Sequence, residues 1–165
     1  MTHPIEIRTA STNDAAELSE LILGNAAVLL KPHYSDQQWE VFARYYSVEQ
    51  MIAKVKTQAV FCAVRENVIV GTVALEDDFV LGFYTRLEDL RQGIGQLLMD
   101  HLETFARSKG ITALQLAASP VGLVFYYKHH WKKVKDLTAK YYGVEFEETL
   151  MKKSLTRDPA PAGFY

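Results

Sequence analysis

The chain has 165 residues, of which 48% are hydrophobic, so it is long enough for one globular domain with a real core and too short for two ordinary ones. Its 18 lysines and arginines nearly balance 20 aspartates and glutamates, which gives a net charge of −2. This balance leaves no broad basic field, which argues against a nucleic-acid partner and against binding to an anionic membrane.

The N-terminal segment predicts a strand followed by a helix. Residues Ile5–Ser11 alternate apolar and polar side chains, as a half-buried strand does. Thr12 or Asn13 is placed to cap the helix that follows, and this helix must end before Pro32. The chain starts without a charged and apolar leader, and no apolar run approaches 18 residues, so we expect no secretory signal and no membrane span.

Two short amphipathic helices come next. Ser35 is placed to cap the first, whose apolar face consists of Trp39, Phe42, Ala43 and Tyr46. Ser47 and Gln50 have the spacing of a capping box, and apolar residues at helical spacing follow them.

The spacing of apolar residues changes from a helical to a strand-like pattern at residue 59. Segments 59–67, 68–77 and 79–86 are rich in β-branched and aromatic residues and are separated by turn-like pairs, which predicts an antiparallel meander. Cys62 is the one cysteine, so no intramolecular disulfide forms and a cytoplasmic protein is the simplest expectation. Its apolar neighbours favour a buried strand residue, although a catalytic thiol stays open.

A glycine turn then leads into a helix, in the stretch LRQGIGQLLMDHLETFA (90–106). The predicted buried face of this helix consists of Leu97, Leu98, His101, Leu102, Phe105 and Ala106, and Gly110 is placed to end it in a left-handed cap. Backbone amides at such a turn, together with the helix N-terminus, form an anion site.

Three interpretations of the glycines compete. A P-loop fails because Gln96 and Leu97 stand where Lys and Ser or Thr are required. A dinucleotide fold is poor because Leu98 occupies the third glycine position and the preceding strands are antiparallel. A plain tight turn, with glycines that serve only the backbone geometry, remains open.

The C-terminal part predicts a buried strand at 113–119, a short helix at 120–130 with Pro120 at its start, and two strands at 131–137 and 145–155. We see no repeat and no linker, so residues 1–155 are expected to form a single domain. Residues 156–165, TRDPAPAGFY, have no pattern and are expected to be a mobile tail.

Three pieces of the chain together resemble the GNAT superfamily of N-acetyltransferases. They are FYTRLEDLRQGIGQLLMDHLETFARSKGI (83–111), LQLAAS (114–119) and FYYKHHW (125–131). The first piece is similar to its acyl-CoA motif, with Leu90 at the Arg/Gln position. The resemblance implies an α/β (α+β) fold: a mixed, mostly antiparallel central sheet, flanked by helices and splayed between the fourth and fifth strands. Gly122 and the pair His130–Trp131 depart from the family's second motif.

The resemblance also implies acetyl-CoA as co-substrate. Its pyrophosphate would lie on the turn amides and its pantetheine along a strand, with residues Phe83, Tyr84, Thr85, Arg91, Gln92, Gly93, Ile94, Gly95, Gln96 and Ser119 as the binding set. Backbone N–H groups near Phe83 or Tyr84 would polarise the thioester carbonyl.

The resemblance places a general acid at Tyr126, which would protonate the departing thiolate; simple packing of its ring is the alternative. The family's usual glutamate position is occupied by Phe79, so Glu76 is the preferred base, ahead of Asp77 and Asp78. Candidate acceptor-site residues are His33, Tyr34 and His129, with Tyr141 as a further possibility. No metal-binding spacing is present, so no metal is predicted.

The expected function is transfer of an acetyl group to a primary amine of a small molecule or peptide, by direct attack in a ternary complex. The alternative is a non-catalytic acyl-CoA-binding sensor or interaction module of the same fold. No nucleic acid or membrane is expected as a partner, and a homodimer is left open.

Overall fold

A computed structural model describes residues 3–156 and contains one seven-stranded sheet in the order β1-β2-β3-β4-β5-β7-β6. The strands are β1 (Glu6–Thr9), β2 (Ala59–Arg65), β3 (Val68–Glu76), β4 (Phe79–Thr85), β5 (Ala113–Ala118), β6 (Lys132–Tyr141) and β7 (Val144–Ser154). All neighbours are antiparallel except β4 and β5, which are parallel and share a single paired position, Phe79 with Gln115. The predicted fold class and the splay between the fourth and fifth strands are therefore confirmed.

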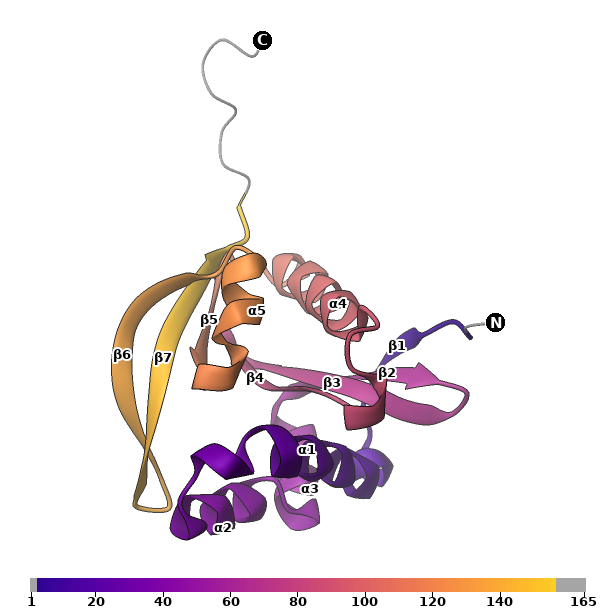
Figure 1. Cartoon of the computed structure of the whole chain (residues 1–165). Coiled ribbons are helices and arrows are strands. Elements are labelled where there is room, and N and C mark those ends of the chain that lie inside the picture. Colours follow the sequence, from indigo (N-terminus) through magenta and orange to yellow (C-terminus); the bar gives the residue numbers. More distant parts are fainter. Residues whose placement is uncertain (1–2, 157–165) are drawn as a thin grey trace, which may run out of the picture.

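Five α-helices cover the two faces of the sheet (Figure 1). They are α1 (Ala15–Leu29), α2 (Asp36–Tyr45), α3 (Val48–Thr57), α4 (Ile94–Ser108) and α5 (Leu123–Lys128). Helices α1–α3 lie on one face and α4 and α5 on the other, and each side has its own apolar core. Within residues 3–156, no helix is long and apolar enough to cross a membrane.

A bulge in β4 explains why the sheet opens. Ala74 of β3 pairs with Leu81 and Thr72 pairs with Tyr84, so Val73 alone faces two residues of β4, Gly82 and Phe83. Gly82 has a φ of +56°, which a residue with a side chain rarely adopts. A bulge bends its strand and increases the local twist, so β4 diverges from β5 beyond Phe79.

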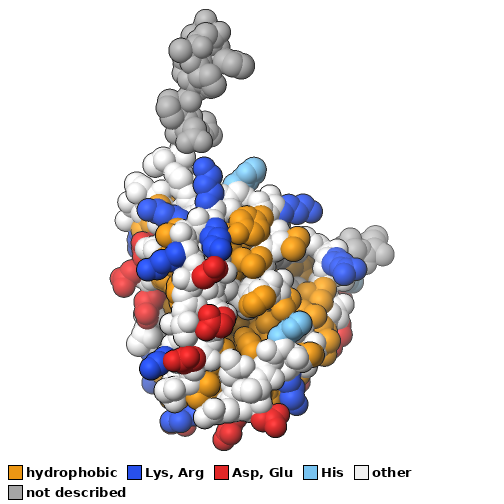
Figure 2. All heavy atoms as spheres, turned by 60° about the vertical axis from the view of Figure 1, so that its left-hand side comes forward, with side chains coloured by type: hydrophobic (Ala, Val, Ile, Leu, Met, Phe, Trp, Pro, Cys, Tyr) orange, Lys and Arg blue, Asp and Glu red, His pale blue; other side chains and the backbone are white. Residues whose placement is uncertain are grey.

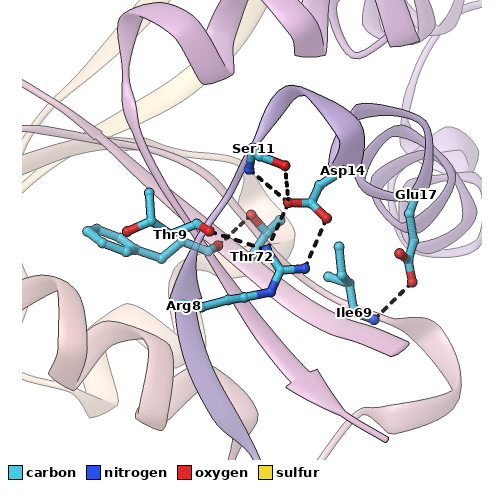
Figure 3. Close-up of polar contacts among 8 residues, drawn as sticks. Arg8, Thr9, Ser11, Asp14, Glu17, Ile69 and Thr72 are labelled. Atoms are coloured by element: carbon cyan, nitrogen blue, oxygen red, sulfur yellow. Dashed lines mark hydrogen bonds and ion pairs between the residues drawn. The ribbon is translucent and has the colours of Figure 1, made fainter. Parts of the chain in front are cut away.

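Side-chain contacts fix the N-terminal strand and α1 on the meander (Figure 3). Arg8 makes two bonds to the Asp14 carboxylate, at 2.8 and 2.9 Å, and these bonds lower the pKa of Asp14. Glu17 accepts a bond from the backbone N–H of Ile69 at 3.0 Å. Asp14, just before α1, and Glu17 in its first turn thus join β1 to β3.

The structure corrects several local predictions. Thr12 and Asn13 lie inside a 3-10 turn (Thr12–Asp14), and the backbone N–H of Ser11 bonds to the Asp14 carboxylate instead. Leu97 is 44% exposed, because the buried stripe of α4 runs through Ile94, Leu98, Met99, Leu102 and Ala106. Strand β6 also extends four residues beyond the predicted end at residue 137.

Other predictions are confirmed. The Ser35 hydroxyl caps α2 through the Gln38 N–H, and Gly110 has a φ of +78° at the end of α4. Cys62 is fully buried in β2, and burial raises the pKa of its thiol to about 12, which favours the inert thiol over the thiolate. The predicted mobile tail lies outside the described residues, apart from Thr156.

Candidate functional site

The glycine turn stands between the end of β4 and the start of α4. Gly93 has a φ of +80° and is the N-cap of α4, and Arg91 also has a positive φ, of 62°. Because the first N–H groups of a helix have no partner within it, this turn directs free donors away from α4. The local geometry fits an anion such as a pyrophosphate.

Gly95 has a different role, because its backbone is helical. A Cβ built there would lie 3.2 Å from Cζ of Phe83 and 3.5 Å from Cε2 of Phe125. The missing side chain therefore lets two aromatic rings, one from β4 and one from α5, pack against the start of α4.

A buried carboxylate, Asp89, is linked to the glycine turn through hydrogen bonds with arginines. Asp89 is 6% exposed and bonds to the guanidinium groups of Arg65 on β2 and Arg86 at the end of β4. Arg65 also donates to Oε1 of Gln92 in the turn, at 2.9 Å. The network ties the turn to two strands of the meander.

We expect Asp89→Asn to lower the free energy of unfolding by about 1–3 kcal/mol, because two guanidinium groups lose their anionic partner. The turn should also lose order, so the affinity for CoA, the ligand that the family resemblance implies, should fall. Thermal unfolding and calorimetry measure the two effects. Glu88→Gln is the matched control, since Glu88 is exposed and lies 3.7 Å from Arg86. Equal losses in both variants would contradict a supporting role for Asp89.

A cavity of about 400 Å³ occupies the splay between β4 and β5. One side is formed by β4, β5 and α5, including Phe83, Ser119 and Phe125. The other is formed by α1, α2 and the β6–β7 hairpin, whose lining residues are Asn25, Leu29, Leu30, Tyr34, Val41, Phe42, Tyr45, Tyr46, Tyr141, Phe146, Glu147 and Glu148. The turn adjoins the cavity, because Leu90, the residue before it, is a lining residue, and a Cβ built at Gly95 would lie 3.2 Å from the lining residue Phe83.

Tyr126 lies on α5 and is one of the residues that line the cavity. Its ring packs on Phe125 at 5.6 Å, Trp131 at 5.8 Å and Phe83 at 6.3 Å between centroids. Burial raises the pKa of its hydroxyl above the ordinary value of 10, so the group stays protonated at physiological pH.

Aromatic rings and two carboxylates line the far end of the cavity, which is the end formed by α1, α2 and the β6–β7 hairpin. Tyr34 packs edge-on against Phe146 at 5.3 Å, and Tyr45 and Tyr141 meet at 5.3 Å. Glu147 and Glu148 are the charged residues among the described lining residues, which include no lysine, arginine or histidine. Figure 2, turned toward the β6–β7 side, shows hydrophobic side chains gathered beside acidic ones.

Glu148 is the more enclosed of the two carboxylates. It is partly buried, and its Oε1 accepts a hydrogen bond from the Tyr141 hydroxyl at 2.8 Å. Burial raises the pKa of Glu148, and the Tyr141 hydrogen bond partly offsets this. Glu147 is exposed and accepts a bond from Thr138 across the hairpin at 2.9 Å.

The predicted cofactor residues of β4 and β5 come together here. Phe83, Tyr84, Thr85 and Ser119 all line the cavity, and Nδ2 of Asn25 donates to the Thr85 carbonyl at 2.7 Å. Residues 91–96 form the adjoining turn and lie outside the lining. Leu90, which departs from the family motif, is itself a lining residue.

The predicted residues for proton removal and acceptor binding divide into two groups. Tyr34 and Tyr141 line the cavity. Glu76, Asp77, His33 and His129 do not; the first three are exposed, and the His129 ring stacks on Phe125 at 4.2 Å.

Asp78 is also outside the lining and accepts a bond from the Gln115 side chain at 2.9 Å, which gives it a structural role where β4 meets β5. Sequence reasoning missed Glu148 and Phe146. Their spacing of two on an alternating strand does place them on one face.

Comparison with known proteins gives one consistent result. The family model described as acetyltransferase (GNAT) domain matches residues 30–155. A GCN5-related N-acetyltransferase from Rhodopseudomonas palustris is 24% identical, with a TM-score of 0.85 over 93% of this chain and 98% of that one.

The PaiA N-acetyltransferase from Thermoplasma acidophilum, solved in complex with coenzyme A, is 22% identical, with a TM-score of 0.77 over 92% of this chain and 99% of that one. YjaB from Escherichia coli, solved in its apo form, is 15% identical, with a TM-score of 0.73 over 90% and 97%. Among curated proteins, none matches the sequence.

Proposed function

The chain belongs to the GNAT acetyltransferase family, and on that premise we propose that it transfers an acetyl group from acetyl-CoA to a primary amine by direct attack in a ternary complex. One observation carries the proposal: a single cavity is lined by Leu90, the residue before the glycine turn, by Tyr126, and by aromatic rings and carboxylates from the β6–β7 side. A cofactor site and an acceptor site that meet in this way suit transfer without a covalent enzyme intermediate.

The residues present fit acetyl-CoA, which would supply the acetyl group as a thioester. The amides of Arg91–Gln96 would bind the pyrophosphate, in keeping with the αL geometry of Gly93. Beyond Phe79, β4 has no ladder partner on the β5 side, so its free backbone groups would bond to the pantetheine arm. Ser119, at the end of β5, lines the same passage.

Tyr126 is the proposed general acid, because it lines the cavity and burial keeps its hydroxyl protonated by raising the pKa. Glu76 as the base stays a prediction that its exposed position outside the lining does not support. No metal is proposed, and residues 3–156 contain no cluster of three or more metal-binding side chains.

A thiol-release assay with acetyl-CoA and a panel of primary amines tests the function. Turnover with any amine supports it. Tight CoA binding, measured by calorimetry, without turnover across the panel would favour a non-catalytic acyl-CoA-binding module.

The raised pKa of Tyr126 gives a pH prediction. Since burial holds the proton on the phenol above its ordinary pKa of 10, kcat should not decline between pH 7 and about pH 10 through loss of that proton. The measurement is kcat at saturating amine across this range. A descending limb below pH 10 that disappears in Tyr126→Phe would contradict the assignment.

A further inference from the structure

The far end of the cavity has a composition that restricts what can bind. Its walls are aromatic, its charges are carboxylates, and the described lining includes no cationic side chain. This lining favours a ligand with positive charge and apolar surface, because a ligand carboxylate or phosphate would find no cationic side chain in it. Lys54 is outside the lining, although its ammonium lies 3.6 Å from the centre of the Tyr45 ring.

From this we infer that the acceptor is a monoamine with an apolar, preferably aromatic, body, and that Glu148 binds its ammonium group and takes the proton that must leave before attack. The inference rests on the proposed acetyl transfer and names its substrate class.

The position of Glu148 favours it over Glu147 as the ammonium partner. Glu148 shares the cavity lining with Tyr34, Tyr45, Tyr46 and Tyr141, and its negative charge contributes to the raised pKa of each of these phenols. The Tyr141 hydroxyl donates to one oxygen at 2.8 Å and so fixes the orientation of the carboxylate. Glu147 is exposed and bonds to Thr138 instead.

The aromatic rings would hold the rest of the acceptor. Ammonium groups are attracted to the faces of tyrosine and phenylalanine rings, and an aryl or alkyl body gains by leaving water among them. Glu148 is the partly buried carboxylate of the described lining, and it matches one ammonium. The second ammonium of a diamine would meet only Glu147, which is exposed and already bonded to Thr138.

Glu148 would convert the bound ammonium into a neutral amine by a single proton transfer. One N–H bond of the ammonium breaks, its proton moves to a Glu148 oxygen, and the electron pair stays on nitrogen, which becomes the neutral nucleophile. Burial favours the protonated form of Glu148 after this transfer, which is consistent with a base that takes a proton from a bound cation.

Binding experiments on the full chain test whether Glu148 binds the ammonium group, independently of turnover. Calorimetry with 2-phenylethylamine and with 2-phenylethanol separates the contribution of charge from that of the ring. Glu148→Gln should weaken the amine by about 10–100-fold, the value of a hydrogen-bonded charge pair, and should leave the alcohol within about twofold. Glu145→Gln is the matched control, because Glu145 is exposed on the same strand and lies outside the lining.

Turnover tests the substrate class. In the thiol-release assay, kcat/KM for 2-phenylethylamine should exceed that for three other amines. Ethanolamine lacks the ring, putrescine has a second ammonium group, and phenylalanine has a carboxylate. A preference for any of these three would overturn the inference while supporting acetyl transfer. Failure of every amine to turn over would instead count against the proposed function, and the binding comparison would still decide the role of Glu148.

A stability readout separates this role from a structural one. Since the pKa of Glu148 is raised in the fold, its charged form costs stability above that pKa, so Glu148→Gln should keep or raise Tm at pH 7.5. Tyr141→Phe gives a second variant, which should weaken the amine less than Glu148→Gln does. If Glu148→Gln leaves the affinity for the amine unchanged, or if Glu145→Gln loses as much affinity, Glu148 does not bind the ammonium group.

Discussion

Gly93→Val should abolish measurable binding of CoA. The native φ of +80° is strained for any residue with a Cβ and worst for a β-branched one, so the variant must rearrange the turn that directs the amides of residues 91–96. Space is not the cause, because a Cβ at Gly93 would meet nothing within 4 Å. Calorimetry with CoA should show no measurable binding, since strain of about 1–3 kcal/mol at this residue favours rearrangement of the turn and the amide contacts are lost with it.

Two controls separate the backbone from the side chains of this turn. Gly93→Asn should keep most of the affinity, because asparagine tolerates the left-handed conformation. Gln92→Ala should change the affinity by less than about threefold, since its amide N–H remains and only the bond to Arg65 is lost. Normal CoA binding by the Val variant would place the pyrophosphate elsewhere.

Gly95→Val should also abolish CoA binding, by another route. Its Cβ would approach Phe83 to 3.2 Å, so the branched side chain would displace the rings that join the turn to the cavity. Thermal unfolding shows whether this variant keeps its fold. A folded Gly95→Val chain with normal CoA affinity would contradict this role.

Tyr126→Phe should lower kcat by about 10²–10⁴-fold, the usual range for general acid catalysis, with Michaelis constants nearly unchanged. The ring and its packing on Phe125 and Trp131 survive the substitution, so the loss would come from the hydroxyl alone. Steady-state thiol release measures both constants.

Tyr127→Phe is the matched control. Tyr127 is the next residue on α5, is 51% exposed and lies outside the cavity lining. It should turn over like the unmodified chain. If Tyr126→Phe does so as well, Tyr126 only packs, and the thiolate takes its proton from solvent or another group.

Most of the fold follows from local signals in the sequence. The meander was predictable because the turn pairs, Glu66–Asn67 and Asp77–Asp78, separate runs of β-branched residues; Glu66, Asn67 and Asp77 do adopt positive φ. The caps at Ser35 and Gly110 were readable for the same reason, since each depends on its own few neighbours. The side of the cavity near the turn could be placed once the family resemblance located β4 and α5.

The acceptor end could not be predicted, because it depends on contacts between distant segments. The Gln38 side chain of α2 bonds to the Glu145 carbonyl of β7 at 2.9 Å, across 107 positions of sequence. Only this kind of packing decides that Phe146 and Glu148 of β7 line the cavity, while His33 is not among its lining residues. Alternation on β7 defined two faces but did not identify which one the cavity uses.

The bulge at Gly82 has a consequence for solubility. A strand with an unpaired backbone invites other chains to add to it, and proteins protect their outer strands against this growth. Here the unpaired stretch of β4 lies inside the sheet, with β3 on one side and the diverging β5 on the other (Figure 1). A second copy of the chain cannot align a whole strand in that position, whereas a thin, flexible, amide-containing arm can. The fold thus keeps a peptide-like binding edge without the aggregation hazard that such an edge carries on an outer strand.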